Sequence, residues 1–64
     1  MAMRKKNYIY EGPVYNGDVI FKSVKIEVEA VTPAQALLFM QRNLRKEHGL
    51  QLWLKEYYLK EIRV

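Results

Sequence analysis

The dipeptide Asn16-Gly17 separates two stretches that favour β-strands, residues 4–15 and 18–30. Asn-Gly is typical of a two-residue type I′ turn, because both central residues of that turn need a positive φ angle. The sequence therefore predicts a β-hairpin in which the numbers of paired residues sum to 33. This register brings opposite charges together across the strands in the pairs Glu11–Lys22, Lys6–Glu27 and Arg4–Glu29.

The same register divides the side chains of the hairpin between two faces, because successive residues of a strand point to opposite sides. The face predicted to form the core carries Ile9, Pro13, Ile20, Val24, Ile26 and Val28. The other face is predicted to stay open and carries Lys6, Tyr8, Tyr10, Val14, Phe21 and Lys25. A bulge or bend is expected at Gly12-Pro13.

A helix start follows the second strand. Thr32 is a suitable N-cap, Pro33 suits the first helical position, and Gln35 can complete a capping box. The helix is expected to run to about residue 47 or 48, with Gly49 as a left-handed stop. Its apolar stripe, which we expect to face the sheet, consists of Ala36, Leu37, Met40 and Leu44.

Residues 53–64 are rich in Tyr, Leu, Ile and Val and are predicted to form a third strand. A right-handed crossover through the helix places this strand beside the first one. The predicted fold class is therefore α+β, in the order ββαβ, with a three-stranded antiparallel sheet of strand order 2-1-3 and one helix packed on one face. The length of 64 residues predicts a single domain, 1–64.

Composition narrows the classes of protein to consider. The chain has no cysteine, which excludes disulfides and thiolate metal sites and favours the cytoplasm. Its longest apolar run is too short to cross a membrane, and the basic start leads into a strand, so we expect neither a membrane segment nor a secretory signal. A formal net charge of +4 favours polyanions, a bias that many unrelated small proteins share.

The residues that usually carry catalysis are sparse and scattered. His48 is the single histidine and falls at the predicted helix end, where the helix dipole favours it, and Ser23 falls in mid-strand without a neighbouring acid and base. The glycines form no phosphate loop and the carboxylates show no metal-site spacing. We therefore predict no enzyme, with no catalytic residues, metal, cofactor or small-molecule substrate.

The predicted open face of the sheet is the first candidate binding surface. Tyr8, Tyr10 and Phe21 lie there between Lys6 and Lys25. Such aromatic rings can stack unpaired bases while lysines hold phosphates, which makes single-stranded nucleic acid one possible partner. The same surface could instead form a homodimer or bind another protein, and both alternatives stay open.

The outward face of the predicted helix is the second candidate. Leu38 shares that face with Arg42 and Arg45, and an apolar residue beside arginines can form a small docking surface, although scattered surface leucines are common. The alternative is that these cations only complement the negative end of the helix dipole.

Two family resemblances add context. The segments 8–14 (YIYEGPV) and 28–36 (VEAVTPAQA) look like small accessory proteins of Gram-positive prophages and integrative conjugative elements, over about half of the chain. The strand, glycine, strand, helix, strand order with a basic helix end is more weakly similar to archaeal ribosomal protein LX. The first resemblance implies a mobile-element context, and the second implies a place on the ribosome.

We therefore expect a small basic binding module encoded on a phage or mobile element. It would associate with a host protein or with itself, through the open sheet face or the outer helix face. The alternative is a module that binds RNA or single-stranded nucleic acid, which includes a role like that of a ribosomal protein.

Overall fold

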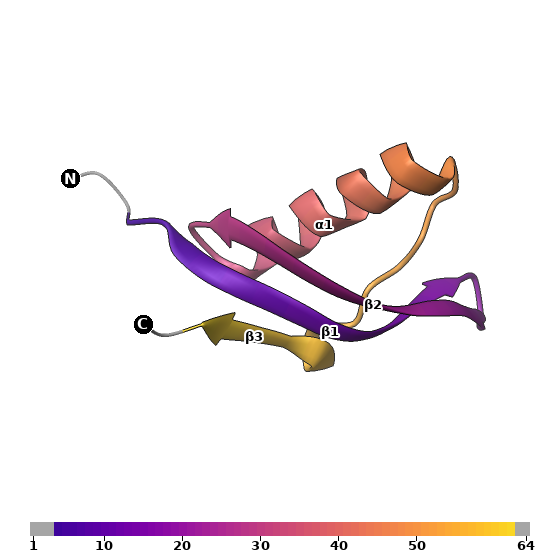
Figure 1. Ribbon diagram of the computed structural model, residues 1–64, viewed down its shortest axis with the longest axis horizontal. Coiled ribbons are helices and arrows are strands. Elements are labelled where there is room, and N and C mark those ends of the chain that lie inside the picture. The colour runs from indigo at the N-terminus through magenta and orange to yellow at the C-terminus, as the bar shows by residue number, and fades with distance from the viewer. Residues whose placement is uncertain (1–3, 63–64) are drawn as a thin grey trace.

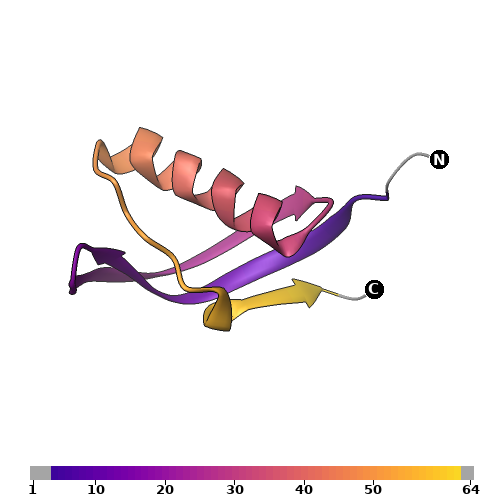
Figure 2. The same cartoon turned by 180° about the vertical axis from the view of Figure 1, so that it is seen from behind.

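The computed structural model describes residues 4–62, which form a three-stranded sheet with a helix over one face (Figures 1 and 2). Every strand pair is antiparallel and the spatial order is β2-β1-β3, so the predicted α+β fold and the 2-1-3 strand order are confirmed. In chain order the elements are β1 (Lys6–Asn16), β2 (Val19–Ala30), α1 (Pro33–His48), a 3₁₀ turn η1 (Glu56–Tyr58) and β3 (Leu59–Ile62).

The hairpin turns one residue later than predicted. Its two turn residues are Gly17 and Asp18, and Asn16 pairs with Val19. Gly17 has a φ angle of 66°, whereas Asp18 does not have a positive φ. A turn that needs a positive φ only at its first central residue matches type II′, which takes glycine there. The predicted type I′ turn centred on Asn16-Gly17 is therefore wrong.

One extra residue in β2 then shifts the register again. Tyr15 pairs with Ile20 but Val14 pairs with Lys22, which leaves Phe21 as a bulge. The bulge thus lies on β2 rather than at the predicted position in the first strand. From Val14 to the start of β1 the numbers of paired residues sum to 36, and the predicted sum of 33 is wrong.

The predicted charge pairs are lost with the predicted register. The ammonium of Lys6 lies 3.7 Å from a carboxylate oxygen of Glu61 in β3. Glu11 faces Lys25, and Arg4 lies before the start of β1. Opposite charges do meet across the sheet, but not between the predicted partners.

The new register also decides which face becomes the core. The observed sum of paired residue numbers, 36, differs from the predicted 33 by an odd number. Because successive side chains alternate between the two faces, an odd shift moves the side chains of one strand to the other face relative to its partner. Tyr8, Tyr10 and Val14 therefore share a face with Val24, Ile26 and Val28, and at most 2% of each of the first three side chains is exposed. The prediction that the aromatic face stays open is wrong, because this is the face that α1 covers.

The helix forms within its predicted bounds because the hydrogen bonds that cap its two ends join residues only three or four positions apart. The Thr32 hydroxyl accepts a hydrogen bond from the Gln35 amide at 3.1 Å, and the Gln35 side chain accepts one from the Val31 amide at 2.9 Å. At the other end Gly49 has a φ of 70° and donates its N–H to the Arg45 carbonyl at 2.7 Å. Of the predicted apolar stripe, Ala36, Met40 and Leu44 are buried, and Leu37 is partly buried against the same core.

The third strand is much shorter than the predicted 53–64. Only Leu59–Ile62 pairs with β1, while Trp53 makes an isolated bridge to Tyr15 and the turn η1 stands between them. The last two residues of the predicted strand lie outside the described residues. The turn lets the Tyr58 side chain lie over Gly12, where the sheet has no side chain of its own.

Tyr10 joins the sheet to the segment that precedes η1. Its hydroxyl donates a hydrogen bond to the Pro13 carbonyl at 2.6 Å and accepts one from the Lys55 amide at 3.1 Å. Its ring is fully buried and packs edge to face against Tyr58, with ring centres 6.0 Å apart. Burial raises the pKa of the Tyr10 hydroxyl above its ordinary value, partly offset by the hydrogen bond from Lys55.

The Tyr10→Phe variant should lose about 1–3 kcal/mol of unfolding free energy, because it leaves the Pro13 carbonyl and the Lys55 amide without a partner. The raised pKa adds a pH signature. The contribution of the Tyr10 hydroxyl is complete below the ordinary tyrosine pKa of about 10 and is lost as pH rises through the higher folded-state pKa. Above about pH 10, the unfolding free energy measured by urea denaturation should therefore fall more steeply with pH for the natural chain than for the variant. An equal fall in both proteins would contradict this account.

The Gly12→Ala variant should lose about 1–3 kcal/mol of stability, because the added methyl would lie 2.6 Å from ring atoms of Tyr58. At a strand glycine with no such obstruction, replacement by alanine would instead raise the stability of the protein. In a Tyr58→Ala background the penalty should shrink, since the colliding ring is gone. A stabilised Gly12→Ala single variant in urea denaturation would show that Tyr58 does not lie over this position.

Candidate functional site

The two tyrosines at the centre of the predicted sheet-face site are not accessible. Tyr8 is 2% exposed and Tyr10 is fully buried, and both belong to the core that α1 closes. Neither ring can stack on a base or contact a second protein in this fold. The predicted aromatic platform is therefore absent.

The other three residues of that predicted site lie apart from one another. Phe21 packs its ring against His48 at the end of α1, with centres 5.3 Å apart, and Lys6 pairs with Glu61. Lys25 lies on the opposite face of the sheet, across from Glu11. The structure thus distributes these residues over the helix side, one sheet end and the open face.

The face that is actually open has a mixed character. Its apolar residues Ile9, Pro13 and Ile62 are half-buried. Its charged residues on the strands are Glu11, Lys25, Glu27, Glu29 and Lys60. Glutamates outnumber lysines among them, so this face lacks the positive charge that phosphate binding needs.

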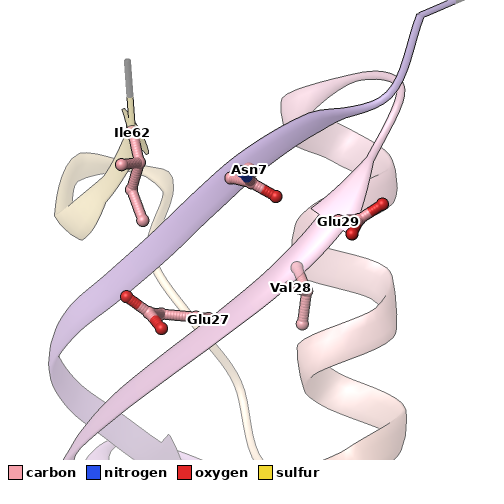
Figure 3. Close-up of a pocket in the computed structure, with 5 residues that line it drawn as sticks. All are labelled: Asn7, Glu27, Val28, Glu29 and Ile62. Carbon is pink, nitrogen blue, oxygen red and sulfur yellow. The ribbon is translucent and has the colours of Figure 1, made fainter. Parts of the chain in front are cut away.

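A hollow of about 520 Å³ lies at one end of the open face, lined by Asn7, Glu27, Val28, Glu29 and Ile62 (Figure 3). Glu27 extends from β2 toward β1, whereas Glu29 points away from β1 (Figure 3). Within residues 4–62 no three acidic or histidine side chains lie close enough to hold a metal ion. The hollow is therefore an acidic depression with an apolar edge.

The opposite end of the open face carries an apolar row that the sequence reasoning did not find. Tyr15 and Trp53 exchange two backbone hydrogen bonds of 2.9 and 2.8 Å, and Tyr15 also faces Ile20. Directly paired residues point to the same side, so Ile20, Tyr15 and Trp53 form one row across the sheet, here called the tip row. Ile20 is 57% and Trp53 54% exposed. The Lys55 ammonium lies 4.7 Å from the centre of the Tyr15 ring.

A signal for the tip row was present in the sequence. Leu52 is fully buried and Leu54 packs against the core, so Trp53 between them has to point the other way. The alternation Leu-Trp-Leu could have marked Trp53 as an exposed aromatic. What the sequence could not supply was its partner, because the bridge to Tyr15 joins residues far apart in the chain.

The residues predicted on the outer helix face do come together. Leu38, Arg42 and Arg45 line a hollow of about 180 Å³ with Gln41 and with Gln51 of the following loop. This set is here called the helix-face site. Leu38 is 44% exposed, and neither arginine forms an ion pair with another residue of the range 4–62. The sequence predicted three of the five residues, and the loop residue Gln51 was missed because its position depends on how the loop returns.

The helix dipole accounts for only part of this site. Arg45, Lys46 and His48 lie in the last turn of α1, where cations complement the helix end. Arg42 and Leu38 lie further back, beyond the reach of that effect, which falls off within one turn. His48 has its ring against Phe21 and a buried Nε2 without a hydrogen-bond partner, so it contributes to packing rather than to the site.

No protein-family model, curated protein or solved structure matches this chain at a significant level. Among the described residues, α1 is not long and apolar enough to cross a membrane. Any functional assignment therefore rests on the geometry of the two surfaces described above.

Proposed function

We propose that this protein is a non-catalytic binding module that docks an acidic segment of a partner protein on the helix-face site. The observation that carries the proposal is the convergence of Leu38, Arg42 and Arg45 with two amide side chains around one hollow. The resemblance to prophage and conjugative-element proteins is compatible with a host protein as that partner.

The chemistry of the site fits such a segment. The two guanidinium groups can each hold a carboxylate through paired hydrogen bonds, and they lack carboxylate partners within residues 4–62. Leu38 offers an apolar contact beside them, while Gln41 and Gln51 can both donate and accept hydrogen bonds. The complementary partner is an acidic segment with one apolar side chain.

The size of the hollow favours a protein partner over a small-molecule substrate. Its volume of about 180 Å³ is below the range of roughly 300–1,000 Å³ that is usual for ligand pockets. It can take a single side chain but cannot enclose a metabolite. The formal net charge of +4 would speed association with an acidic partner at low salt.

The nucleic-acid alternative has less support. Its aromatic platform is buried, and the open face carries more glutamate than lysine on its strands. Arg42 and Arg45 would still supply phosphate contacts, and an oligothymidine probe separates that outcome from peptide binding.

The probe is a fluorescent peptide with glutamates on both sides of one leucine, compared with an oligothymidine of similar charge. Arg42→Glu/Arg45→Glu should weaken peptide binding at least about ten-fold, because two charge-assisted contacts are lost. Leu38→Glu should weaken it similarly by placing a like charge in the hollow.

The matched control is Lys5→Glu/Lys22→Glu, which changes the net charge equally on exposed residues outside both the helix-face site and the open sheet face. If both double variants lost the same peptide affinity, the effect would come from overall charge, and the proposed site would be contradicted. Preferential binding of the oligothymidine, lost with the two arginines, would support the nucleic-acid alternative instead.

A further inference from the structure

The open face of the sheet is electrically balanced on a chain that is otherwise basic. Its three lysines, counting Lys55 over the Tyr15 ring, equal its three glutamates in number. The whole formal charge of +4 therefore falls on the rest of the molecule. Two copies of this chain can approach through their open faces without the repulsion that their other surfaces would cause.

The balanced charges are unevenly distributed along the face. Glu27 and Glu29 line the hollow near the start of β1. Lys55 lies at the opposite end beside the tip row, because Tyr15 is next to the last residue of β1 whereas Asn7 is next to the first. Figures 1 and 2 show the turn between β1 and β2 at the end of the molecule away from the start of β1 and the end of β3. One end of the face is thus an acidic hollow, and the other is an apolar ridge with a cation.

We propose that two copies of this chain associate face to face through these open faces, related by a two-fold axis. The tip row of each copy would lie over the acidic hollow of the other, with Lys55 near Glu27 and Glu29 of the second copy. A two-fold axis requires each surface to be complementary to itself, and opposite charges at opposite ends satisfy that requirement. Both tip-to-hollow contacts form at once in an antiparallel arrangement of the two sheets.

The apolar content of the two ends fits this arrangement. Trp53 and Ile20 are more than half exposed, and the hollow of about 520 Å³ has Ile62 at its edge. A tryptophan that enters a hollow on the opposing surface is typical of residues that dominate interface energies. Half-buried Ile9 and Pro13 would lie between the two ends and be covered as well.

Sedimentation equilibrium of the full chain tests the proposal. The natural chain should form dimers, and Ile20→Lys, a change at a 57% exposed side chain, should raise the dimer dissociation constant at least about ten-fold. Leu38→Glu on the helix-face site should leave dimerisation unchanged. A natural chain that stays monomeric to roughly 1 mM, or a dimer lost in Leu38→Glu but kept in Ile20→Lys, would overturn the proposal.

A charge exchange tests the arrangement of the two copies. Lys55→Glu alone and Glu27→Lys/Glu29→Lys alone should each weaken self-association, because each places like charges at both tip-to-hollow contacts. An equimolar mixture of the two variants should recover dimers, since every contact then joins opposite charges. Lys46→Glu on α1 controls for net charge and should leave the dimer intact. A mixture that fails to recover would overturn the face-to-face arrangement.

Peptide binding and dimerisation use different residues of this protein. Peptide binding at the helix-face site depends on Leu38 and the two arginines, and dimerisation depends on Ile20, Lys55 and the acidic hollow. Ile20→Lys should therefore still bind the acidic peptide, with its dissociation constant within about three-fold of that of the natural chain.

Discussion

The hydroxyl of Tyr10 lies between two backbone groups, the carbonyl of Pro13 in β1 and the amide of Lys55 in the returning segment. The first bond is local to β1, and the second ties the central strand to a residue 45 positions away in the chain. The ring below them packs against Tyr58 and is fully buried. A single side chain therefore joins the hairpin, the loop after α1 and the approach to β3, in a core that has few other residues to do so.

The burial of Tyr10 in turn depends on the hairpin register. Because β1 and β2 pair with an even sum, the tyrosines of one strand and the branched residues of the other lie on one side, and α1 can cover them together. The opposite side is left with alternating charges, isolated isoleucines and the tip row. The surplus positive charge collects elsewhere, notably on the last turns of α1. The fold thus separates a basic helix surface from a neutral sheet surface, and each suits a different kind of contact.

The candidate site on the helix could be predicted because helix phase is a local property. Thr32 sets where α1 begins, and from there the spacing of 3.6 residues assigns Leu38, Arg42 and Arg45 to the outer face. The candidate site on the sheet could not be predicted in the same way. Its assignment needed the register, and a turn displaced by one residue followed by one bulge was enough to move Tyr8 and Tyr10 from the open face to the core. The tip row depends on a bridge between Tyr15 and Trp53 that no local pattern specifies.

The amino-acid sequence by itself determined the element order, the bounds of α1 and the strand order β2-β1-β3. These follow from capping residues, from apolar spacing and from the handedness of a crossover, which act over a few residues or through a general chain preference. Only the tertiary structure decided which sheet face is buried and where the third strand begins. Both depend on how well distant side chains fill the space under α1, as with Tyr58 over Gly12, and that packing exists only once the segments have met.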